Sequence, residues 1–565
     1  MSSTMPHARS VLKHYFGYDD FRAGQVDVIA SVLSRRDTLG VLPTGGGKSL
    51  CYQVPALVFP GLTIVISPLI SLMKDQVDRL RQRGVAATLL NSTLGGGEVS
   101  RRLSDVALGR MKLLYVAPER FEAGDLHRAL RSCPIALLAV DEAHCISEWG
   151  HDFRPSFRRI ANVSRTLGAP QMIALTATAT PSVREDIARQ LGMRTPKVIV
   201  GGFDRENLSY AVRDCTNDDE KDRALLAALK AAPGAAVVYA STRATVERVA
   251  RQLSRRGVSA VPYHAGLDDR HRHHVQETFM SGAVNAIVAT NAFGMGIDKP
   301  DVRLVLHYAM PGTLEAYYQE AGRAGRDGKP GRCVLLHAHT DRFTHEYFIR
   351  GMYPERTCVE RVYAAVQAGR ALPAGRECEA ALRFLVQQGA VVHPRQHSTA
   401  GHVRLLAAPG RIKRELQIPR VTRNDFMSGH SERSEESAVD IAVLRELWRA
   451  HRERLYAGVT VDLDALPPGI AGRVARSALE RLQSRQFVHL TSLDTGPQPA
   501  RPNAPLDTFR IDWTALARRR ANDFAKLDTM QGYAYTKNCR RAFVLRYFGE
   551  QRPRTRCNGC DNCLS

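Results

Sequence analysis

A glycine-rich stretch, VLPTGGGKSL (residues 41–50), has the residue types and spacing of a phosphate-binding loop. Its glycines let backbone N–H groups wrap phosphate oxygens, and the N-terminus of a following helix adds partial positive charge. Lys48 would reach the β- and γ-phosphates of ATP, and the Ser49 hydroxyl would bind Mg²⁺. The strict motif has glycine where this chain has Leu42, so the loop is a variant that needs support from other residues. The residues expected to hold the phosphates are Thr44, Gly45, Gly46, Gly47, Lys48 and Ser49.

That support comes from LLAVDEAHC (137–145), where two acids follow an apolar strand. If the strand ends at Val140, Asp141 and Glu142 emerge at the carboxyl edge of the sheet, where open α/β sheets bind ligands. Asp141 can hold Mg²⁺, and Glu142 can orient and deprotonate an attacking water. Phosphoryl transfer needs little beyond such positioning and charge neutralisation.

A second half of the site is predicted in YYQEAGRAGRDG (317–328). Arg323 and Arg326 are three residues apart and share a face if the segment is helical. An arginine pair facing the phosphate loop could stabilise the transferring phosphate. Taken alone, the pair favours a solvated turn; beside a phosphate site, the role in catalysis is favoured.

Three cysteines in CNGCDNC (557–563) lie at a spacing of three, close to the end of the sequence. Zinc takes four tetrahedral ligands, and thiolates serve it well. Cys557, Cys560 and Cys563 can wrap one ion, and Cys539 would complete the set. Disulfides are the alternative, which a reducing compartment disfavours.

The elements that position these residues form two tandem α/β domains. Residues 1–203 alternate short apolar strands with amphipathic helices, and residues 204–345 repeat the pattern. This alternation predicts parallel sheets covered by helices. The hinge is expected near GGFDRENLSY (201–210).

From residue 346 the pattern changes to an accessory region of mixed α/β type, extending to 515. Two helix–strand segments, ECEAALRFLVQQGAVV and VARSALERLQSRQFVHLTSL, are each followed by a candidate returning strand, HVRLLAAP and DTFRIDW respectively. A helix followed by a β-hairpin predicts a winged-helix-like fold. Residues near 420–438 are polar without apolar periodicity, which predicts a disordered insert. Residues 516–565 are expected to form a small helical module around the cysteines.

Composition sets the wider limits. The chain has 565 residues and a formal net charge of +22, an excess that indicates a polyanionic partner such as nucleic acid. No segment has the length and apolarity of a membrane span or a signal peptide, so a cytoplasmic protein is expected.

Taken together, the motifs resemble those of superfamily 2 helicases. FGYDDFRAGQ, PTGGGKS, SPLISLMKDQ, VAPER, DEAHC, ALTATAT, ATNAFGMGIDKPDVR and QEAGRAGRDG stand in the family order, and the whole set is similar to the RecQ family of DNA helicases. The resemblance covers about residues 10–345 and the tail after 520, where RYFGE and CDNC are similar to the RecQ zinc-binding module.

The resemblance implies two RecA-like motor domains that use ATP, Mg²⁺ and Zn²⁺. It implies 3′→5′ translocation on single-stranded DNA and unwinding of partly duplex DNA in recombination or repair. A single-stranded-DNA-binding protein or repair proteins are possible partners, with a nucleoid-associated location. By position, Tyr18 would stack on the adenine, and Arg22 and Gln25 would contact it.

SEWGHDFRPSF (147–157) is similar to the family's aromatic-rich loop. Aromatic rings stack on unpaired bases while cations hold the backbone. The DNA-binding residues expected here are Trp149, Phe153, Arg154 and Phe157. Their position just after Glu142 could let DNA binding report to hydrolysis.

The chain departs from the family pattern in one respect. About 175 residues separate the second motor domain from the zinc module, and nothing follows the zinc site, where the family usually has a winged helix. The strand-separating element therefore cannot be carried over. Two alternatives remain open beside a DNA helicase: an ATP-switched DNA clamp or translocase without strand separation, and an RNA helicase.

Overall fold

The computed structural model describes residues 4–91, 93–122, 124–131, 133–150, 152–294, 299–392, 400–407, 411, 430–467, 469–492, 497–550 and 555–564. The chain folds into two compact units. The first comprises the residues up to Ile349 together with those from Arg518, and the second comprises Arg350–Ala517. Each unit is described by itself.

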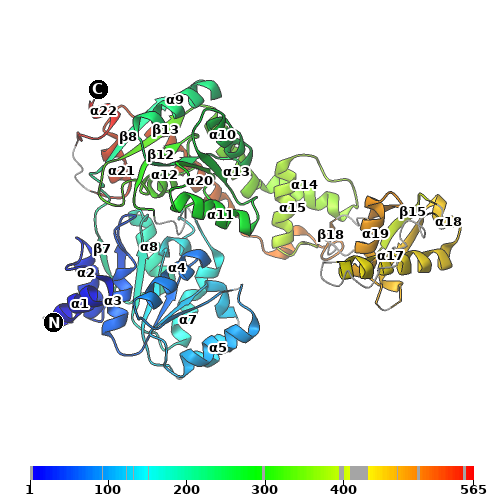
Figure 1. Ribbon diagram of the computed structural model, residues 1–565, viewed down its shortest axis with the longest axis horizontal. Coiled ribbons are helices and arrows are strands. Elements are labelled where there is room, and N and C mark those ends of the chain that lie inside the picture. The colour runs from blue at the N-terminus through cyan, green and yellow to red at the C-terminus, as the bar shows by residue number, and fades with distance from the viewer. Residues whose placement is uncertain are drawn as a thin grey trace. The chain divides into compact units, whose positions relative to one another are not determined.

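The first domain of the first unit is a seven-stranded sheet in the order β3-β4-β2-β5-β6-β1-β7, drawn in blue to cyan in Figure 1. Every strand pair is parallel, and the central strands are apolar and buried, as expected for a sheet covered on both faces. The strands are β1 (Thr38–Val41), β2 (Leu62–Ile66), β3 (Ala87–Leu90), β4 (Leu113–Val116), β5 (Ile135–Val140), β6 (Met172–Thr176) and β7 (Lys197–Val200). The helices are α1 (Thr4–Val11), α2 (Gln25–Leu33), α3 (Leu50–Val58), α4 (Ile70–Gln82), α5 (Gly96–Ala107), α6 (Gly124–Leu130), α7 (Ile160–Thr166) and α8 (Pro181–Leu191).

The second domain is a six-stranded parallel sheet in the order β10-β11-β9-β12-β13-β8, drawn in green in Figure 1. Its strands are β8 (Leu208–Asp214), β9 (Ala235–Tyr239), β10 (Ala260–Tyr263), β11 (Ala286–Ala289), β12 (Val302–His307) and β13 (Gly331–His337). Its helices are α9 (Asp218–Ala231), α10 (Arg243–Arg255), α11 (Asp269–Met280), α12 (Leu314–Ala321) and α13 (Asp341–Met352), the last of which continues into the second unit. The prediction of two parallel-sheet domains is confirmed.

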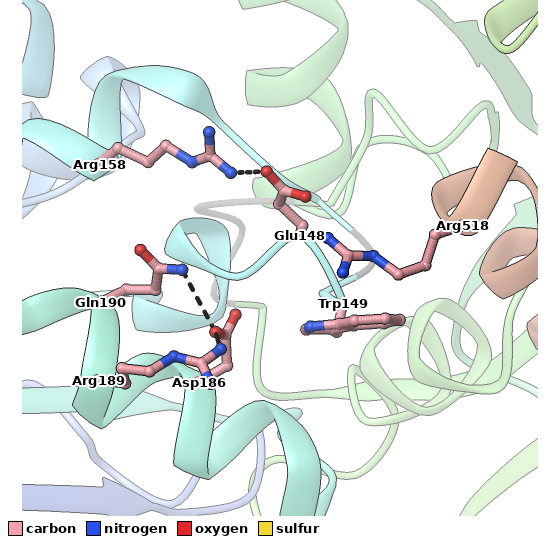
Figure 2. A pocket seen from close by; sticks show the side chains of 7 residues that line it. All are labelled: Glu148, Trp149, Arg158, Asp186, Arg189, Gln190 and Arg518. Atoms are coloured by element: carbon pink, nitrogen blue, oxygen red, sulfur yellow. Dashed lines mark hydrogen bonds and ion pairs between the residues drawn. The ribbon is translucent and has the colours of Figure 1, made fainter. Parts of the chain in front are cut away.

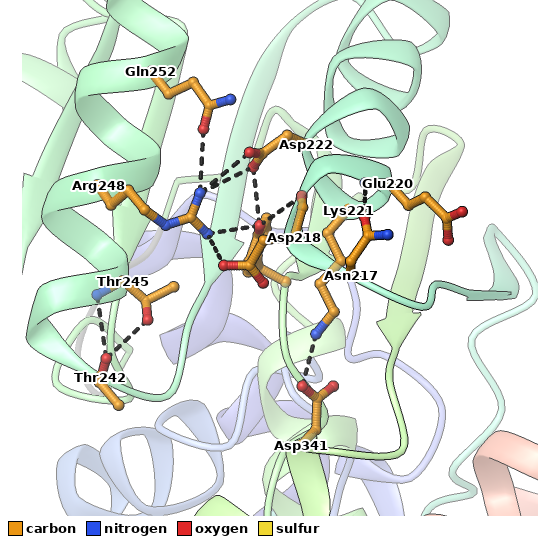
Figure 3. A network of polar contacts seen from close by, with 11 residues as sticks. Asn217, Asp218, Glu220, Lys221, Asp222, Thr242, Thr245, Arg248, Gln252 and Asp341 are labelled. Carbon is orange, nitrogen blue, oxygen red and sulfur yellow. Dashed lines mark hydrogen bonds and ion pairs between the residues drawn. The ribbon is translucent and has the colours of Figure 1, made fainter.

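A polar network fastens α9 and α10 to the second sheet (Figure 3). Arg248 on α10 donates to Tyr308 Oη at 2.7 Å and pairs with Asp222 on α9 at 3.2 Å. Lys221 donates to Asp341 at 2.7 Å, and both of these charged side chains are buried. The network satisfies charges that would otherwise be costly to bury, and it lies outside the motifs singled out above.

The zinc module belongs to the first unit. It contains α20 (Trp513–Tyr535) from Arg518 onward, α21 (Arg540–Tyr547) and α22 (Asp561–Leu564). Cys560 forms a parallel bridge with Tyr210, and Tyr210 N–H donates to the Gly559 carbonyl at 2.7 Å. The cysteine loop therefore covers the edge strand β8 of the second sheet. In the described part of the chain, no helix combines the length and apolar character needed to span a membrane.

The second unit contains two small cores. In one core, α14 (Arg356–Gln367) and α15 (Arg376–Gln387) pack together beside an antiparallel pair, β14 (Val391–Val392) and β18 (Gln498–Pro499). The other core lies between β14 and β18 in the sequence. It consists of β15 (Ala400–Leu405), α17 (His430–His451), α18 (Arg454–Ala457), β16 (Val459–Asp462), α19 (Arg473–Ser484) and β17 (Val488–Ser492).

The sheet of this inserted core has the antiparallel order β16-β15-β17. The helix–strand–helix–strand succession α17, β16, α19, β17 resembles a winged helix. The central strand, however, precedes the first helix instead of following the last one. The topology is thus that of a winged helix whose third strand has moved to the front of the sequence.

Three expectations for this region are wrong. HVRLLAAP does not return along β14, because β15 pairs with β16 and β17. DTFRIDW is not a strand, because it forms a 3₁₀ turn (Leu506–Phe509) that leads into α20. Its aromatic residues pack on α14 and α15. The ring centroids of Phe509 and Tyr363 are 6.0 Å apart, and those of Trp513 and Phe384 are also 6.0 Å apart.

The third error concerns the disordered insert expected near residues 420–438, and it applies only to the part from His430 onward. Residues from His430 onward are helical, because α17 begins there. The stretch is rich in Glu and Arg, which favour helices, so polarity without apolar periodicity did not distinguish a helix from a disordered segment. Residues 412–429 lie outside the described residues.

We predict that Gly61→Ala destabilises the first domain by at least about 2 kcal/mol, because Gly61 has φ +95° and an added Cβ would lie 2.4 Å from the Pro134 carbonyl oxygen. Gly84→Ala is the matched control, because φ is +77° but nothing lies within 4 Å of the added Cβ, so only about 1 kcal/mol is expected. Thermal or denaturant unfolding of the full chain measures both. Equal losses of stability in the two variants would contradict the close contact at Gly61.

Candidate active site and zinc centre

The phosphate loop joins β1 to α3, as the sequence predicts. Gly45 and Gly47 have φ values of +79° and +73°, which glycine adopts without strain. An added Cβ on Gly47 would lie 2.3 Å from Gln25 Nε2, so this glycine also makes room for a side chain. Lys48 and Ser49 come directly before α3, and both side chains are partly exposed.

Two of the three residues assigned to adenine contact the phosphate loop, one from the start of α2 and one from the segment before it. Gln25 is buried and donates to the carbonyls of Gly46 and Gly47 at 3.1 and 2.9 Å. Arg22 donates to the Gly45 carbonyl at 2.7 Å. Tyr18 is half exposed and free to stack. Their roles toward the base stay predictions.

Asp141 and Glu142 stand directly after β5, which ends at Val140 as predicted. Glu142 has φ +48°, an uncommon value for a residue with a side chain, and such strain occurs at functional sites. Its Oε2 lies 3.4 Å from Nδ1 of His144, which in turn lies 2.9 Å from the Thr176 hydroxyl at the end of β6. The acid pair is thereby linked to the ALTATAT segment (174–180).

Burial raises the pKa of Asp141 to about 7, and the neighbouring Glu142 charge adds to the effect. Lys48 acts in the opposite direction. The buried carboxyl thus needs a cation beside it to remain ionised at neutral pH. Asp141 and Ser49 offer oxygen ligands of the kind that Mg²⁺ takes, and their role in holding the metal stays a prediction.

Arg323 and Arg326 lie in a loop (322–327), here called the arginine loop, in the segment between α12 and β13. An added Cβ on Gly45 would lie 3.4 Å from Arg326 Cγ, so Arg326 packs directly on the phosphate loop. Arg323 is buried, and its Nη2 would lie 2.6 Å from a Cβ added to Gly294 in the second domain. Of the two predicted arginines, Arg326 therefore contacts the phosphate loop, whereas Arg323 contacts Gly294 of the second domain.

The aromatic loop lies beside α20 of the zinc module (Figure 2). Arg518 lies over the Trp149 ring, 5.3 Å from its centroid. Glu148 pairs with Arg158 and accepts a 2.9 Å bond from Arg519, while the buried Lys526 donates to the Trp149 and Gly150 carbonyls.

A cavity of about 320 Å³ opens beside this contact. Its lining combines one indole ring with charged and amide groups: Glu148, Trp149, Arg158, Asp186, Arg189, Gln190 and Arg518. Such a combination of an aromatic ring and cations suits a nucleic acid strand.

The other predicted residues of the aromatic loop divide between surface and core. Phe153 is partly exposed beneath Arg158, and Arg154 is held by the Pro68 carbonyl and Asp152. Phe157 is wholly buried in the first-domain core, in a 3₁₀ turn, so its assignment to stacking on DNA is wrong in this structure. The motif segment 289–303 is described except for residues 295–298.

The four cysteines converge. The Sγ atoms of Cys539, Cys557, Cys560 and Cys563 all lie within 4.8 Å of one another. Burial raises the pKa of Cys560 to about 12, whereas a hydrogen bond from the Cys557 N–H lowers that of Cys563. Four thiol groups that converge in this way fit the tetrahedral coordination of Zn²⁺. Binding of the ion would replace the thiol protons.

The neighbours that hold the cysteine loop were missed by sequence reasoning. Asp561 accepts from the Val212 N–H at 2.8 Å and from Arg540 at 2.6 Å, and Asn562 Nδ2 donates to the carbonyls of Thr536 and Asn538. Asp and Asn between the cysteines of CNGCDNC were visible as side chains able to fix a turn. Their partners, mostly backbone groups, were not.

Comparison with known proteins agrees with this geometry. The chain matches the family models for the DEAD/DEAH box helicase (residues 22–187), the helicase conserved C-terminal domain (220–328) and RecQ zinc-binding (507–564). The fold is similar to a crystal structure of the DUF1998 helicase MrfA bound to DNA, with TM-score 0.50 and 17% identity over 68% of this chain and 57% of that one. Two facing parallel-sheet domains with these motifs define the superfamily 2 helicase class.

Two curated relatives identify the family within the superfamily 2 helicases. The chain is 40% identical over 348 residues to the probable ATP-dependent DNA helicase RecS of Bacillus subtilis, covering 61% of this chain and 70% of that protein. It is 48% identical over 345 residues to the ATP-dependent DNA helicase RecQ of the same species, covering 60% of this chain and 58% of that protein. The chain belongs to the RecQ family of helicases. It spans between half and three fifths of the length of the RecQ proteins that it matches.

We predict about one zinc per chain and its loss in Cys560→Ser, because a buried hydroxyl replaces one of four converging thiolates. Metal analysis of the purified full chain measures it. Cys133→Ser, at a partly buried thiol that donates to the Val106 and Ala129 carbonyls, should keep the zinc. Full zinc content in Cys560→Ser would contradict the four-cysteine site.

Proposed function

We propose that the chain is an ATP-dependent DNA helicase that moves 3′→5′ along single-stranded DNA and separates duplex DNA in recombination or repair. The observation that carries the proposal is the contact of the phosphate loop with the arginine loop within one unit, where Gly45 lies against Arg326. A nucleotide bound there would touch both parallel-sheet domains. Its hydrolysis would remove that bridge, which is how ligand-dependent closure drives stepping.

The roles of the residues follow from their positions. Bound ATP with Mg²⁺ supplies the phosphoryl group and the metal charge. Lys48 and the glycine N–H groups hold the phosphates, and Ser49 and Asp141 hold the metal. In this proposal Glu142 orients and deprotonates water, and Arg326 meets negative charge on the transferring phosphate.

The nucleic acid side is proposed to be the aromatic loop with α20. Trp149 and Phe153 offer rings, and Arg158 and Arg518 offer cations beside them. Glu142 begins the segment that leads to this loop, and His144 links the acid pair to Thr176. Strand binding at Trp149 can therefore alter the positions of Glu142 and its water.

DNA is favoured as substrate by the relatives, whose names describe ATP-dependent DNA helicases. The net charge of +22 suits a polyanion. We propose single-stranded and partly duplex DNA as the substrate, in the cytoplasm at the nucleoid. Single-stranded-DNA-binding protein is a candidate partner.

The proposal is tested with a labelled strand annealed to leave a 3′ tail, a 5′ tail or a fork. We expect displacement from the 3′-tailed and forked duplexes, dependent on ATP and Mg²⁺. Lys48→Ala should abolish hydrolysis and displacement because the phosphate loop then lacks its own cation for the β- and γ-phosphates, while DNA binding persists. Turnover in Lys48→Ala would contradict the site.

The same assay separates the alternatives. DNA-stimulated hydrolysis without displacement from any of the three duplexes would point to a translocase or clamp. Stronger stimulation by RNA than by DNA of the same sequence would point to an RNA helicase. Displacement from the 5′-tailed duplex alone would contradict the proposed polarity.

We predict that Trp149→Ala lowers DNA-stimulated hydrolysis by about tenfold and leaves hydrolysis without DNA within about twofold, because a stacking ring contributes ~1–3 kcal/mol per base. Phe343→Ala, at an exposed ring on α13, is the control and should change neither rate. ATPase titrations with single-stranded DNA measure both. An equal loss with and without DNA would contradict the role of Trp149 in sensing DNA.

A further inference from the structure

Arg205 lies in the linker between the two parallel-sheet domains, and its guanidinium contacts both halves of the nucleotide site. Nη1 donates to the Thr44 carbonyl of the phosphate loop at 2.9 Å. The same nitrogen lies 3.3 Å from the Gly322 carbonyl, and Nη2 donates to the carbonyls of Ala324 and Gly325 at 3.1 and 2.9 Å. Among these contacts, one reaches the first domain and three reach the arginine loop.

The three carbonyls of the arginine loop flank the two arginines. Gly322 precedes Arg323, and Ala324 and Gly325 precede Arg326. The segment lies between α12 and β13, so no regular helix or strand fixes it. Arg205 supplies donors in a rigid planar fork that fix the turn instead.

A second linker residue supports the same turn. Asn207 Nδ2 donates to the carbonyls of Gly325 and Lys329, both at 2.8 Å. Gly325 has φ +55°, and an added Cβ would lie 2.5 Å from that amide nitrogen. Asn207 also accepts from Arg205 Nε at 3.3 Å, so the two linker side chains form one group.

On the opposite side, the phosphate loop closes on the arginine loop around Arg205. An added Cβ on Gly45 would lie 3.6 Å from Arg205 Nη1 and 3.4 Å from Arg326 Cγ. One added to Gly322 would lie 3.0 Å from Thr44 Cβ. The bond from Arg205 to Thr44 thus lies at the point where the phosphate loop and the arginine loop approach each other.

The linker is itself anchored from behind by the zinc module. The buried Arg541 of α21 pairs with Asp204 and donates to the carbonyls of Arg205 and Leu208 at 2.9 and 2.6 Å. The Phe203 ring stacks on Phe548 with centroids 4.6 Å apart. Arg205 therefore projects from a fixed backbone and not from a loose tether.

We propose that Arg205 is a positioning residue for ATP hydrolysis, which holds the turn carrying Arg326 at the distance from the phosphate loop that the transition state requires. The inference rests on the proposed function. Arg205 acts through Arg326, and its one bond to the first domain is the bond to the Thr44 carbonyl. Neither relation depends on the substrate strand.

The test is Arg205→Lys in the full chain, which keeps the positive charge but replaces the fork with one ammonium that cannot span carbonyls on two loops. We expect kcat for DNA-stimulated ATP hydrolysis to fall by about 10- to 100-fold, because misplacement by about 1 Å costs up to about 10². KM for ATP should change by less than about threefold, since Lys48 and the glycine N–H groups still bind the phosphates. An unchanged kcat would overturn the proposal.

A double-mutant cycle distinguishes positioning from mere support of the fold. Arg326→Lys keeps a charge and residual turnover. In that background, Arg205→Lys should lower kcat by less than about twofold, because the group that it positions is already impaired. If the two losses multiply, Arg205 does not act through Arg326 and the proposal fails.

Arg248→Lys is the matched control, because Arg248 is also a partly buried arginine of the second domain, in the network of Figure 3. It should lower thermal stability while kcat stays within about twofold. A fall in its kcat as large as that of Arg205→Lys would assign both losses to weakened folding and overturn the proposal. The wild-type chain is assayed alongside. If the wild-type chain hydrolyses no ATP with any nucleic acid, the proposed function itself fails. If the wild type is active and Arg205→Lys is equally active, only the proposed role of Arg205 fails.

Discussion

The hydrogen bonds that a single guanidinium makes to main-chain carbonyls on two loops are the constraint on which the nucleotide site depends. Two parallel sheets joined by a short linker have many possible relative orientations, and the phosphate loop and arginine loop meet in few of them. Arg205 selects such an orientation by bonding to Thr44 on one side and to Gly322, Ala324 and Gly325 on the other. The acids, the lysine and Arg326 are useful only within that arrangement.

The zinc module extends this constraint to the nucleic acid side. Its Arg541 grips the linker, its cysteine loop covers the edge of β8, and Lys526 holds the Trp149 and Gly150 carbonyls of the aromatic loop. A segment this small has little core of its own, and convergent thiolates around a metal compensate for that. The zinc module therefore has structural contacts at two places, the linker and the aromatic loop.

The sequence was sufficient to predict the features that depend on local sequence patterns, namely the strands and the groups at their carboxyl ends. Apolar runs followed by Gly-Lys-Ser or Asp-Glu identify strands and the groups at their carboxyl ends, because burial and ligand binding both act there. The cysteine set followed from spacing. The partners of β15 could not be predicted, since they lie more than 50 residues away and pairing leaves no local signal. Phe157 was misassigned because an aromatic residue between cations has the same pattern whether its ring faces solvent or core.

Four of the residues that were missed share one property, which is that they act on backbone atoms. Arg205, Asn207, Arg541 and Lys526 all donate to carbonyls, and a carbonyl has no residue type that a sequence could reveal. The residues expected to act in hydrolysis can be recognised in the sequence because the reaction needs particular side chains. The alignment of those side chains depends on backbone groups, which every residue has. In this chain the second class of contact is concentrated in the linker and the zinc module, so the parts that look least catalytic in the sequence determine whether the catalytic parts meet.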